Sequence, residues 1–312
     1  MSRWHGCGRC TTRHIRVPER STVDLPGATV SYLEWAARRP ASGLTVVLLH
    51  GGGLDNAALS WGEIGPRLAA AGHRVVAPDH PGYGRSPAAS WRATQQRLVD
   101  YVGEFTDALD LGPHVTGGLS LGGGMTIGHA LARPGSVTAA MLLGSYGLMP
   151  RLSDGPFSGP RQVLTWALLR TGLLTTLSRG VARHRWMLER SMAALVRDAT
   201  RRTPELLDEV SAAARSDDAF AAFEQWQRDQ VRCTGLRTDY RDRLADIAVP
   251  VLVVHGGSDS AVPVAHAHDA AAAIPAATLD VVAGAGHWVQ RDQPDLVGSI
   301  MLSFLGRLGT GS

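Results

Sequence analysis

Lysine is absent from the 312-residue sequence, and all 31 basic side chains are arginine. A Schiff base on the protein, a phosphate-binding P-loop lysine and a serine–lysine dyad are therefore excluded. Against 28 acidic residues, the arginines leave a formal net charge of +3. Their excess lies in residues 1–20 and 151–243 and forms no dense basic stripe, so we expect no nucleic-acid partner.

Cysteine and long apolar runs are scarce as well. Cys7, Cys10 and Cys233 are too few for a disulfide framework, which favours a reducing compartment. The longest apolar stretches, such as Leu44–Leu49 and Val137–Leu143, are far shorter than the roughly 20 residues that span a bilayer. The N-terminal region lacks the apolar core of a secretory signal. We expect a soluble, cytoplasmic protein with no membrane partner, and a homodimer is left open.

The remaining pattern alternates strands and helices. Short β-branched runs predict strands over Thr29–Leu33, Leu44–Leu49, Arg74–Ala77, His114–Gly117, Val137–Leu143, Val249–Val254 and Thr278–Val282. Helical spacing of apolar residues lies between most of them, at Ala57–Ala71, Trp91–Leu109, Leu121–Ala132, Pro263–Ile274 and Pro294–Leu308. Such alternation predicts an α/β fold with a mainly parallel sheet covered on both faces.

The alternation is interrupted once, over residues 148–242. This stretch has no strand-like run and instead carries helical sequence such as Val163–Leu177 and Pro204–Ala214. We interpret it as a helical cap inserted between two strands. The expected division is a flexible tail over residues 1–20, a core over 21–147 and 243–312, and the cap over 148–242.

The pentapeptide Gly118–Gly122 reads Gly-Leu-Ser-Leu-Gly, between a predicted strand and a predicted helix. In this G-x-S-x-G arrangement a sharp strand-to-helix turn exposes the serine hydroxyl above the sheet. Glycines flank the serine because a Cβ there would clash. Ser120 is therefore the predicted nucleophile.

A serine hydroxyl needs a general base, and the base needs an acid that orients it. Downstream, Asp259 and His287 each follow a predicted strand, at the sheet edge where sites form in open α/β sheets. The order serine, acid, histidine is the one that this architecture uses. The rival acids lie before a strand, on a helix and inside a strand: Asp246, Asp269 and Asp280. We therefore predict Asp259 as the acid and His287 as the base.

A glycine run, Gly51–Gly53, follows the predicted strand that ends at Leu49. Its backbone can present an N–H group to an oxyanion, so Gly52 or Gly53 together with the N–H of Leu121 forms the predicted oxyanion hole. The expected substrate-binding residues are His50, Leu119, Trp166 and Trp288. Two of these have a second interpretation, since His50 suits a loop-bracing role through backbone hydrogen bonds and Trp166 suits packing inside the cap.

These motifs together resemble the α/β-hydrolase superfamily over about residues 22–308. The loop Asp79–Ser86 is similar to the turn after the fourth strand in that family. The resemblance implies an eight-stranded sheet with a helical cap. Because the nucleophile is a serine and not an aspartate, it points away from haloalkane dehalogenases and epoxide hydrolases.

Three segments are similar, more narrowly, to the meta-cleavage-product C–C hydrolases: His50–Gly53, Ser120–Gly123 and Gly286–Gln290. That subfamily places an Arg-Trp pair in a cap helix to hold the substrate carboxylate. The comparable segment here, Thr203–Arg215, has Val210-Ser211 instead.

We therefore expect a serine hydrolase that cleaves a small, largely apolar ester or thioester through an acyl-enzyme. The alternatives are a C–C hydrolase of a vinylogous diketone, a non-hydrolytic lyase, cyclase or perhydrolase, and a non-enzymatic ligand receptor. An intact triad argues against the receptor.

The N-terminal residues His5, Cys7, Cys10 and His14 have the side chains of a tetrahedral zinc site. Their spacing is shorter than in the usual zinc finger, and no apolar residues nearby would support a small domain. A frayed tail is the favoured interpretation. We expect no metal and no cofactor.

Overall fold

The computed structural model describes residues 18–37, 43–215 and 220–309. Within them the strands are β1 (Glu19–Leu25), β2 (Ala28–Trp35), β3 (Thr45–Leu49), β4 (Arg74–Pro78), β5 (His114–Leu119), β6 (Val137–Leu143), β7 (Val251–Gly256) and β8 (Ala277–Val282). The helices of the sheet region are α1 (Ala57–Trp61), α2 (Gly65–Ala70), α3 (Gln95–Ala108), α4 (Leu121–Ala132), α10 (Val264–Ala273), α11 (Val289–Asp292) and α12 (Pro294–Gly309).

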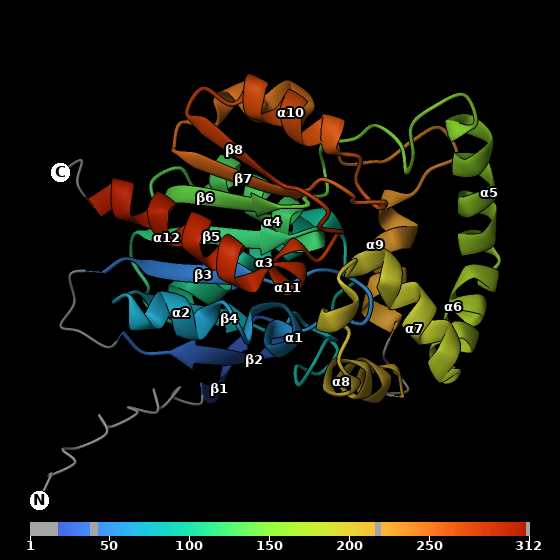
Figure 1. Cartoon of the computed structure of the whole chain (residues 1–312), viewed down its shortest axis with the longest axis horizontal. Coiled ribbons are helices and arrows are strands. Elements are labelled where there is room, and N and C mark those ends of the chain that lie inside the picture. The colour runs from blue at the N-terminus through green and yellow to red at the C-terminus, as the bar shows by residue number, and fades with distance from the viewer. Residues whose placement is uncertain (1–17, 38–42, 216–219, 310–312) are drawn as a thin grey trace, which may run out of the picture.

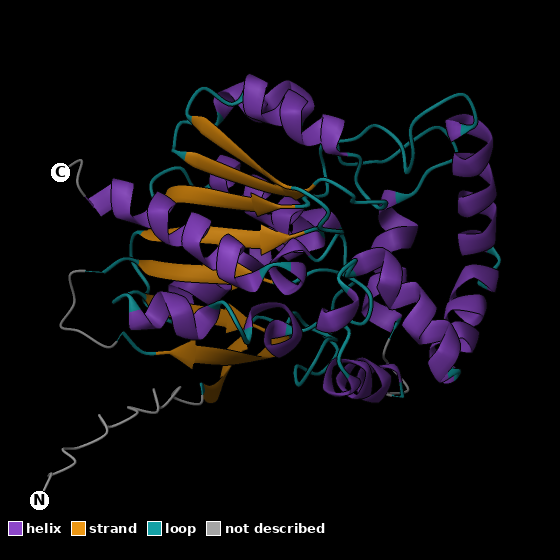
Figure 2. Cartoon of the chain, viewed as in Figure 1, coloured by secondary structure: helices purple, strands orange, loops and turns teal. Residues whose placement is uncertain are grey.

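The described strands form one eight-stranded sheet in the order β1-β2-β4-β3-β5-β6-β7-β8. β1 and β2 are antiparallel to their neighbours, and the strands from β4 to β8 run parallel. Figure 2 shows the strands together in one part of the molecule with helices on both sides. The predicted mostly parallel, eight-stranded sheet is confirmed.

Strand side chains alternate between the two faces of the sheet, and helices cover both faces, so both sets of side chains on the central strands are buried. On β3, Val46 and Leu48 pack into the core beside α1, α2 and α12. Their neighbours Val47 and Leu49 pack into a second core beside α3 and α4. This is why β3 is almost continuously apolar. The burial fixes the register of the strand that leads into the glycine run.

Between β6 and β7 the described chain is helical. This cap consists of α5 (Ser158–Arg170), α6 (Leu173–Arg183), α7 (Arg185–Leu195), α8 (Pro204–Ala214) and α9 (Ala221–Gln230), with short 3-10 helices η1 (Ala199–Arg201) and η2 (Arg241–Asp246). Figure 1 shows the cap helices on the side of the sheet where the parallel strands end. The cap therefore covers the edge at which the predicted site residues lie.

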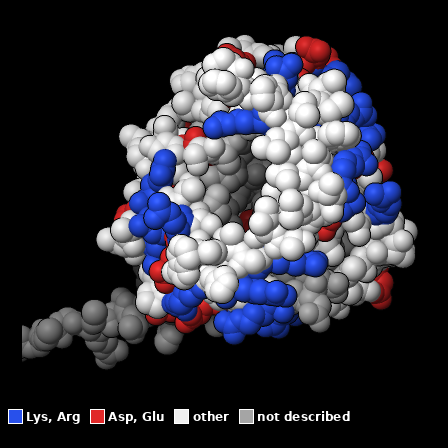
Figure 3. All heavy atoms as spheres, turned by 90° about the vertical axis from the view of Figure 1, so that its right-hand side faces the viewer, with Lys and Arg blue, Asp and Glu red and all other residues white. Residues whose placement is uncertain are grey.

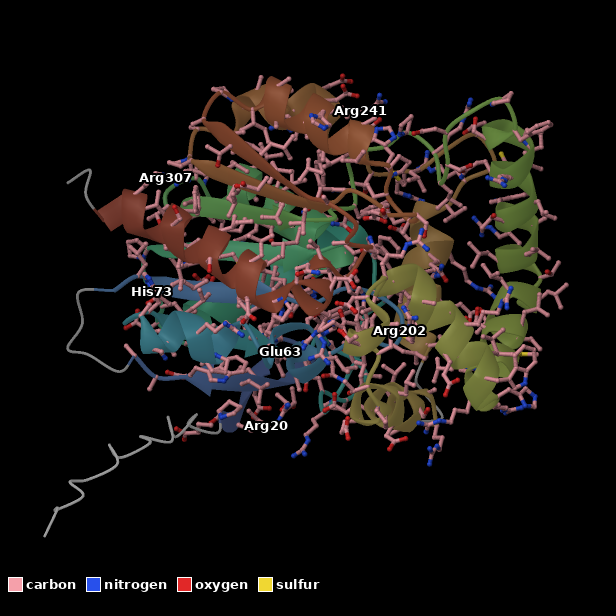
Figure 4. All side chains as sticks on the ribbon, in the orientation of Figure 1. Arg20, Glu63, His73, Arg202, Arg241 and Arg307 are labelled. Atoms are coloured by element: carbon pink, nitrogen blue, oxygen red, sulfur yellow. The ribbon has the colours of Figure 1, made fainter. Side chains whose placement is uncertain are left out.

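Two elements differ from the sequence prediction. β1 begins at Glu19, inside the segment expected to be a flexible tail. Arg20 on β1 (Figure 4) donates to the buried carboxylate of Asp79 at 2.7 Å and to Ser31 Oγ at 2.8 Å. The helix expected over Ala57–Ala71 is divided into α1 and α2, because Pro66 lacks a backbone N–H and starts a new helix.

None of the helices in the described part of the chain has the length and apolar character needed to cross a membrane.

Candidate active site

Ser120 sits in the sharp turn between β5 and α4, as predicted. Its backbone has φ +51° and ψ −112°, a left-handed conformation that is strained for a residue with a Cβ. Hydrogen bonds hold the turn, since the Ser120 N–H donates to Leu143 at 2.9 Å and its carbonyl accepts from Tyr146 at 2.9 Å. The strain is the cost of presenting the hydroxyl above the sheet edge.

The glycines on either side of Ser120 are sterically required. A Cβ at Gly118 would lie 2.1 Å from the carbonyl oxygen of Gly122. A Cβ at Gly122 would lie 2.3 Å from the carbonyl oxygen of Leu49. Both obstacles are backbone atoms, which cannot rotate away. The G-x-S-x-G spacing thus follows from the close approach of β3, β5 and α4.

Asp259 and His287, in the loops after β7 and β8, form a hydrogen bond of 2.8 Å between Oδ2 and Nδ1. The other carboxylate oxygen of Asp259 accepts from the N–H groups of Ala261 at 2.7 Å and Val262 at 3.0 Å. Burial alone would raise the pKa of Asp259, but the His287 hydrogen bond and charge and these backbone donors together hold it below its usual value. Asp259 therefore stays ionised and fixes the orientation of the imidazole.

The loop after β3 carries the predicted oxyanion residues. Buried Asp55 ties this loop together by accepting from Gly51 N–H at 2.7 Å, Asn56 N–H at 2.8 Å and Ser60 Oγ at 2.7 Å. Burial raises the pKa of Asp55 to about 6, against the lowering effect of these hydrogen bonds. The strand end, the loop and α1 are thus held as one unit.

Gly52 and Gly53 occupy different surroundings within that loop. A Cβ at Gly52 would lie 2.4 Å from the ring of Phe223 on α9. Gly53 has φ +77° and open space around its missing Cβ. The cap therefore contacts the loop directly at Gly52.

A cavity of about 620 Å³ joins the site residues under the cap. Its core-side lining includes Gly51–Leu54, Ser120, Leu121, Ala261, His287 and Trp288. Its cap-side lining includes Leu174, Leu177, Ser178, Val181, Ala182, Leu188, Ser191, Met192, Leu195, Val210, Phe220, Phe223 and Trp226. Among the described residues, the lining contains no arginine, aspartate or glutamate. The space is therefore apolar except at the serines and the imidazole.

The structure thus brings together Ser120, His287, the predicted oxyanion residues and Trp288. Three other expected substrate contacts are corrected, because they do not line the cavity. His50 is fully buried, its Nε2 accepts from the N–H of His80 at 2.9 Å, and its Nδ1 lies 2.7 Å from the Gly51 carbonyl. Burial lowers the pKa of His50 to about 3, so it is a neutral brace between two loops. Leu119 is fully buried in the sheet core, and Trp166 on α5 lies outside the lining.

The aromatic residues that do line the cavity on the cap side were missed from the sequence. Phe223 and Trp226 on α9 stack with ring centroids 5.6 Å apart, and Trp226 packs edge-on against Tyr146 at 4.7 Å. The Trp226 Nε1–H donates to Gln95 on α3 at 2.8 Å, which anchors the cap to the core. The spacing of Phe220, Phe223 and Trp226, three residues apart, is the available signal for one helix face.

The loop that carries His287 is joined to the cap. Buried Asp292 accepts from the backbone N–H of Gly286 at 2.6 Å and from the backbone N–H groups of the cap residues Arg197, at 2.9 Å, and Asp198, at 2.8 Å. The N–H of Trp288 donates to the Leu195 carbonyl at 2.9 Å. The cap and the loop that carries His287 therefore share one hydrogen-bond network.

A salt-bridge cluster strengthens the same junction. The carboxylate of Glu63 (Figure 4) forms salt bridges with Arg201 of the cap, at 2.5 Å, and with Arg291 of α11, at 3.1 Å. Both arginines and the carboxylate are mostly shielded from solvent, which strengthens such pairs relative to exposed ones.

No group of three or more His, Cys, Asp or Glu side chains within the described ranges is placed to hold a metal ion. The candidate zinc residues His5, Cys7, Cys10 and His14 lie outside the described residues.

Comparisons with known proteins agree with this architecture. A family described as alpha/beta hydrolase fold matches residues 45–294. The chain is 28% identical, over 287 residues, to 2-hydroxy-6-oxo-6-(2'-aminophenyl)hexa-2,4-dienoic acid hydrolase of Metapseudomonas resinovorans, covering 91% of this chain and 90% of that protein.

Two solved structures are similar to the chain. One is a serine hydrolase involved in carbazole degradation, with TM-score 0.76 and 23% identity, covering 93% of this chain and 100% of the other. The second is a carboxylesterase of Bacillus subtilis, with TM-score 0.72 and 21% identity, covering 93% of this chain and 92% of the other. At these identities they show a shared fold.

Proposed function

The chain belongs to the alpha/beta hydrolase fold family, and from this premise we propose that it is a serine hydrolase of uncharged, largely apolar carboxylic esters or thioesters. The observation that carries the proposal is the cavity. It places Ser120 and His287 in a space whose described lining is apolar and has no charged arginine, aspartate or glutamate side chain. An acyl chain is stabilised in such a space by removal of its surface from water.

The reaction begins with attack of Ser120 Oγ on the carbonyl carbon. The hydroxyl proton passes to Nε2 of His287, and ionised Asp259 stabilises the imidazolium through the 2.8 Å bond to Nδ1. The carbonyl oxygen becomes an oxyanion beside the N–H of Leu121 and an N–H of Gly52 or Gly53.

Collapse of this tetrahedral species breaks the bond to the leaving oxygen or sulfur, which takes the proton from His287. A water molecule then gives a proton to His287 and attacks the acyl carbon. The carboxylic acid leaves, and the proton returns to Ser120 Oγ.

A C–C hydrolase is the second candidate, and the relative from Metapseudomonas resinovorans favours it, because that protein is named for a dienoic acid substrate. The cavity argues for the ester. Val210, at the position compared with the arginine of the C–C hydrolases, is buried and lines the cavity. A carboxylate bound there would lose its hydration without gaining a cation from the described lining, and an unpaired buried charge costs several kcal/mol.

The test is turnover across p-nitrophenyl acetate, butyrate, octanoate and benzoate, an acyl-thioester and a carboxylated vinylogous diketone. We expect kcat/KM to rise from the acetate to the longer or aromatic acyl groups. Fastest turnover of the acetate ester, or activity with the diketone alone, would refute the proposal.

Substitutions test the assigned roles. Ser120→Ala and His287→Ala should lower kcat/KM at least about a thousandfold, and Asp259→Asn nearly as much, because it favours the wrong histidine tautomer. Ser178→Ala is the matched control, since Ser178 lines the same cavity from the cap and should keep most of the activity. A fluorophosphonate probe should label the parent and the control but not Ser120→Ala, and a pure ligand receptor would not be labelled.

A further inference from the structure

Exposed large apolar side chains are concentrated on the cap. Of the eight in the described residues, six lie between residues 157 and 186: Phe157, Val163, Leu164, Leu173, Leu177 and Trp186. Phe157 is 71% exposed and Trp186 is 62% exposed. Single exposed apolar residues are ordinary, but a group on neighbouring elements indicates an interaction surface.

The same part of the cap is strongly basic. Residues 157–190 contain six arginines and one acid, Glu189. Arg185 pairs with Glu189 and Asp208. The other five form no ion pair with a described residue: Arg161, Arg170, Arg179, Arg183 and Arg190. We call the six apolar residues and these five arginines the cap face.

Apolar and basic residues alternate within the cap face. On the exposed side of α5, two apolar residues are flanked around the helix axis by two arginines: Val163, Leu164, Arg161 and Arg170. Aromatic and leucine side chains bordered by arginine are the residue types that proteins place where they meet a membrane interface.

The cap face also adjoins the mouth of the active-site cavity. Leu177 is 53% exposed and at the same time lines the cavity, so the apolar surface continues into the site. Figure 3 shows the cap side of the molecule with a hollow whose border is mostly uncharged, with arginines and some acidic surface beside it. The exposed apolar surface and the cavity that contains Ser120 therefore share Leu177.

We propose that the cap face docks peripherally on an anionic lipid bilayer, with the cavity mouth turned toward the lipid, which revises the sequence-based expectation of no membrane partner. The positive charge of the cap face favours an anionic bilayer over a second copy of the chain as its partner. In a symmetric dimer the same face would meet itself, and unpaired arginines would lie against arginines. Anionic headgroups pair with them, while the apolar side chains enter the interface.

The test is sedimentation of the Ser120→Ala protein with phosphatidylcholine vesicles, alone or with about one-third phosphatidylglycerol. Using this variant separates binding from hydrolysis, so failure of the proposed ester chemistry would not affect the result. We expect binding to the anionic vesicles and weakening of that binding by salt. Arg161→Gln, Arg170→Gln and Arg179→Gln combined should lower partitioning about 100-fold, at about one kcal/mol per arginine.

Leu164→Ser with Trp186→Ser should also weaken binding, with less dependence on salt. Matched controls lie outside the cap face: Arg92→Gln removes an exposed arginine, and Val281→Ser removes an exposed apolar residue. Each should bind as the parent does. Unchanged circular dichroism spectra and Tm values show that the arginine and apolar variants are folded, and this control does not depend on the proposed ester chemistry.

Three outcomes overturn the proposal. The first is no binding to anionic vesicles, and the second is equal loss of binding in the control variants. The third is a dimer in sedimentation velocity that the cap-face substitutions dissociate, which would assign the face to a second copy.

Discussion

Arg20→Met should destabilise the fold measurably, although Arg20 lies at the edge of the sheet. The Asp79 side chain is 1% exposed and that of Arg20 is 22% exposed. Removing the guanidinium deletes its charge-assisted hydrogen bond of 2.7 Å to Asp79. The Asp79 carboxylate then keeps two hydrogen bonds, from the backbone N–H groups of Ala57 at 2.9 Å and Arg85 at 3.0 Å. Methionine keeps the apolar stem, so the change removes the guanidinium with its hydrogen bonds to Asp79 and Ser31 but little of the packing.

The magnitude follows from these contacts. A hydrogen bond to a charged group contributes about 1.5–3 kcal/mol, and because two donors remain and Arg20 is partly solvated we expect about 2 kcal/mol. For a chain of this length that corresponds to a loss of about 3 °C in Tm. Thermal unfolding followed by circular dichroism measures it.

Arg243→Met is the matched control for this prediction. Arg243 pairs with Asp246 on the surface, where the two side chains are 59% and 54% exposed. Loss of that pair should cost less than about 0.5 kcal/mol. If Arg20→Met costs no more than Arg243→Met, or if a double-mutant cycle with Asp79→Asn gives no coupling energy, the argument is refuted.

Three further predictions concern the site and the pH response. Gly52→Ala should lower kcat, because the added Cβ would lie 2.4 Å from the ring of Phe223. Gly135→Ala is the control, since no atom lies near the added Cβ, and its kcat should not change. Equal kcat values for the two variants would contradict the prediction. Val210→Arg should improve kcat/KM for a carboxylated ester over its uncharged analogue about tenfold, and an unchanged ratio would show that the carboxylate does not reach α8. Burial lowers the pKa of His129 to about 3 from 6.5, so its stabilising contribution is present above pH 6.5 and is lost as pH falls toward 3. Between pH 7 and pH 5, His129→Leu should therefore lose about 2 kcal/mol less stability than the parent in urea unfolding, and parallel pH profiles would refute the assignment.

The spatial arrangement of the three proposed catalytic residues was predictable because each of them is marked locally. Ser120 has flanking glycines that the backbone of β3 and α4 requires, and Asp259 and His287 directly follow apolar runs. Strand ends in a parallel sheet meet at one edge, so positions along the chain translate into positions in space.

The cap and the first strand could not be predicted in the same way. β1 is an edge strand whose side chains are exposed or half-buried, so its apolar alternation is weak. In the cap, the sequence predicts the helices, but which side of each helix faces the cavity depends on how the helices pack together. That is why Trp166 was expected at the substrate while Phe223 and Trp226 line the cavity.

The cap leaves the sheet after β6 and returns at β7, and these two strands are hydrogen-bonded neighbours, with Ala140 opposite Val251. The insertion therefore begins and ends at almost the same place, and its exchange leaves the register of every strand unchanged. The three proposed catalytic residues and most of the cavity lining are then encoded in separate stretches of the gene. Recombination with a related gene across residues 150–240 should transfer substrate preference together with surface affinity, while Ser120, Asp259 and His287 are inherited from the host.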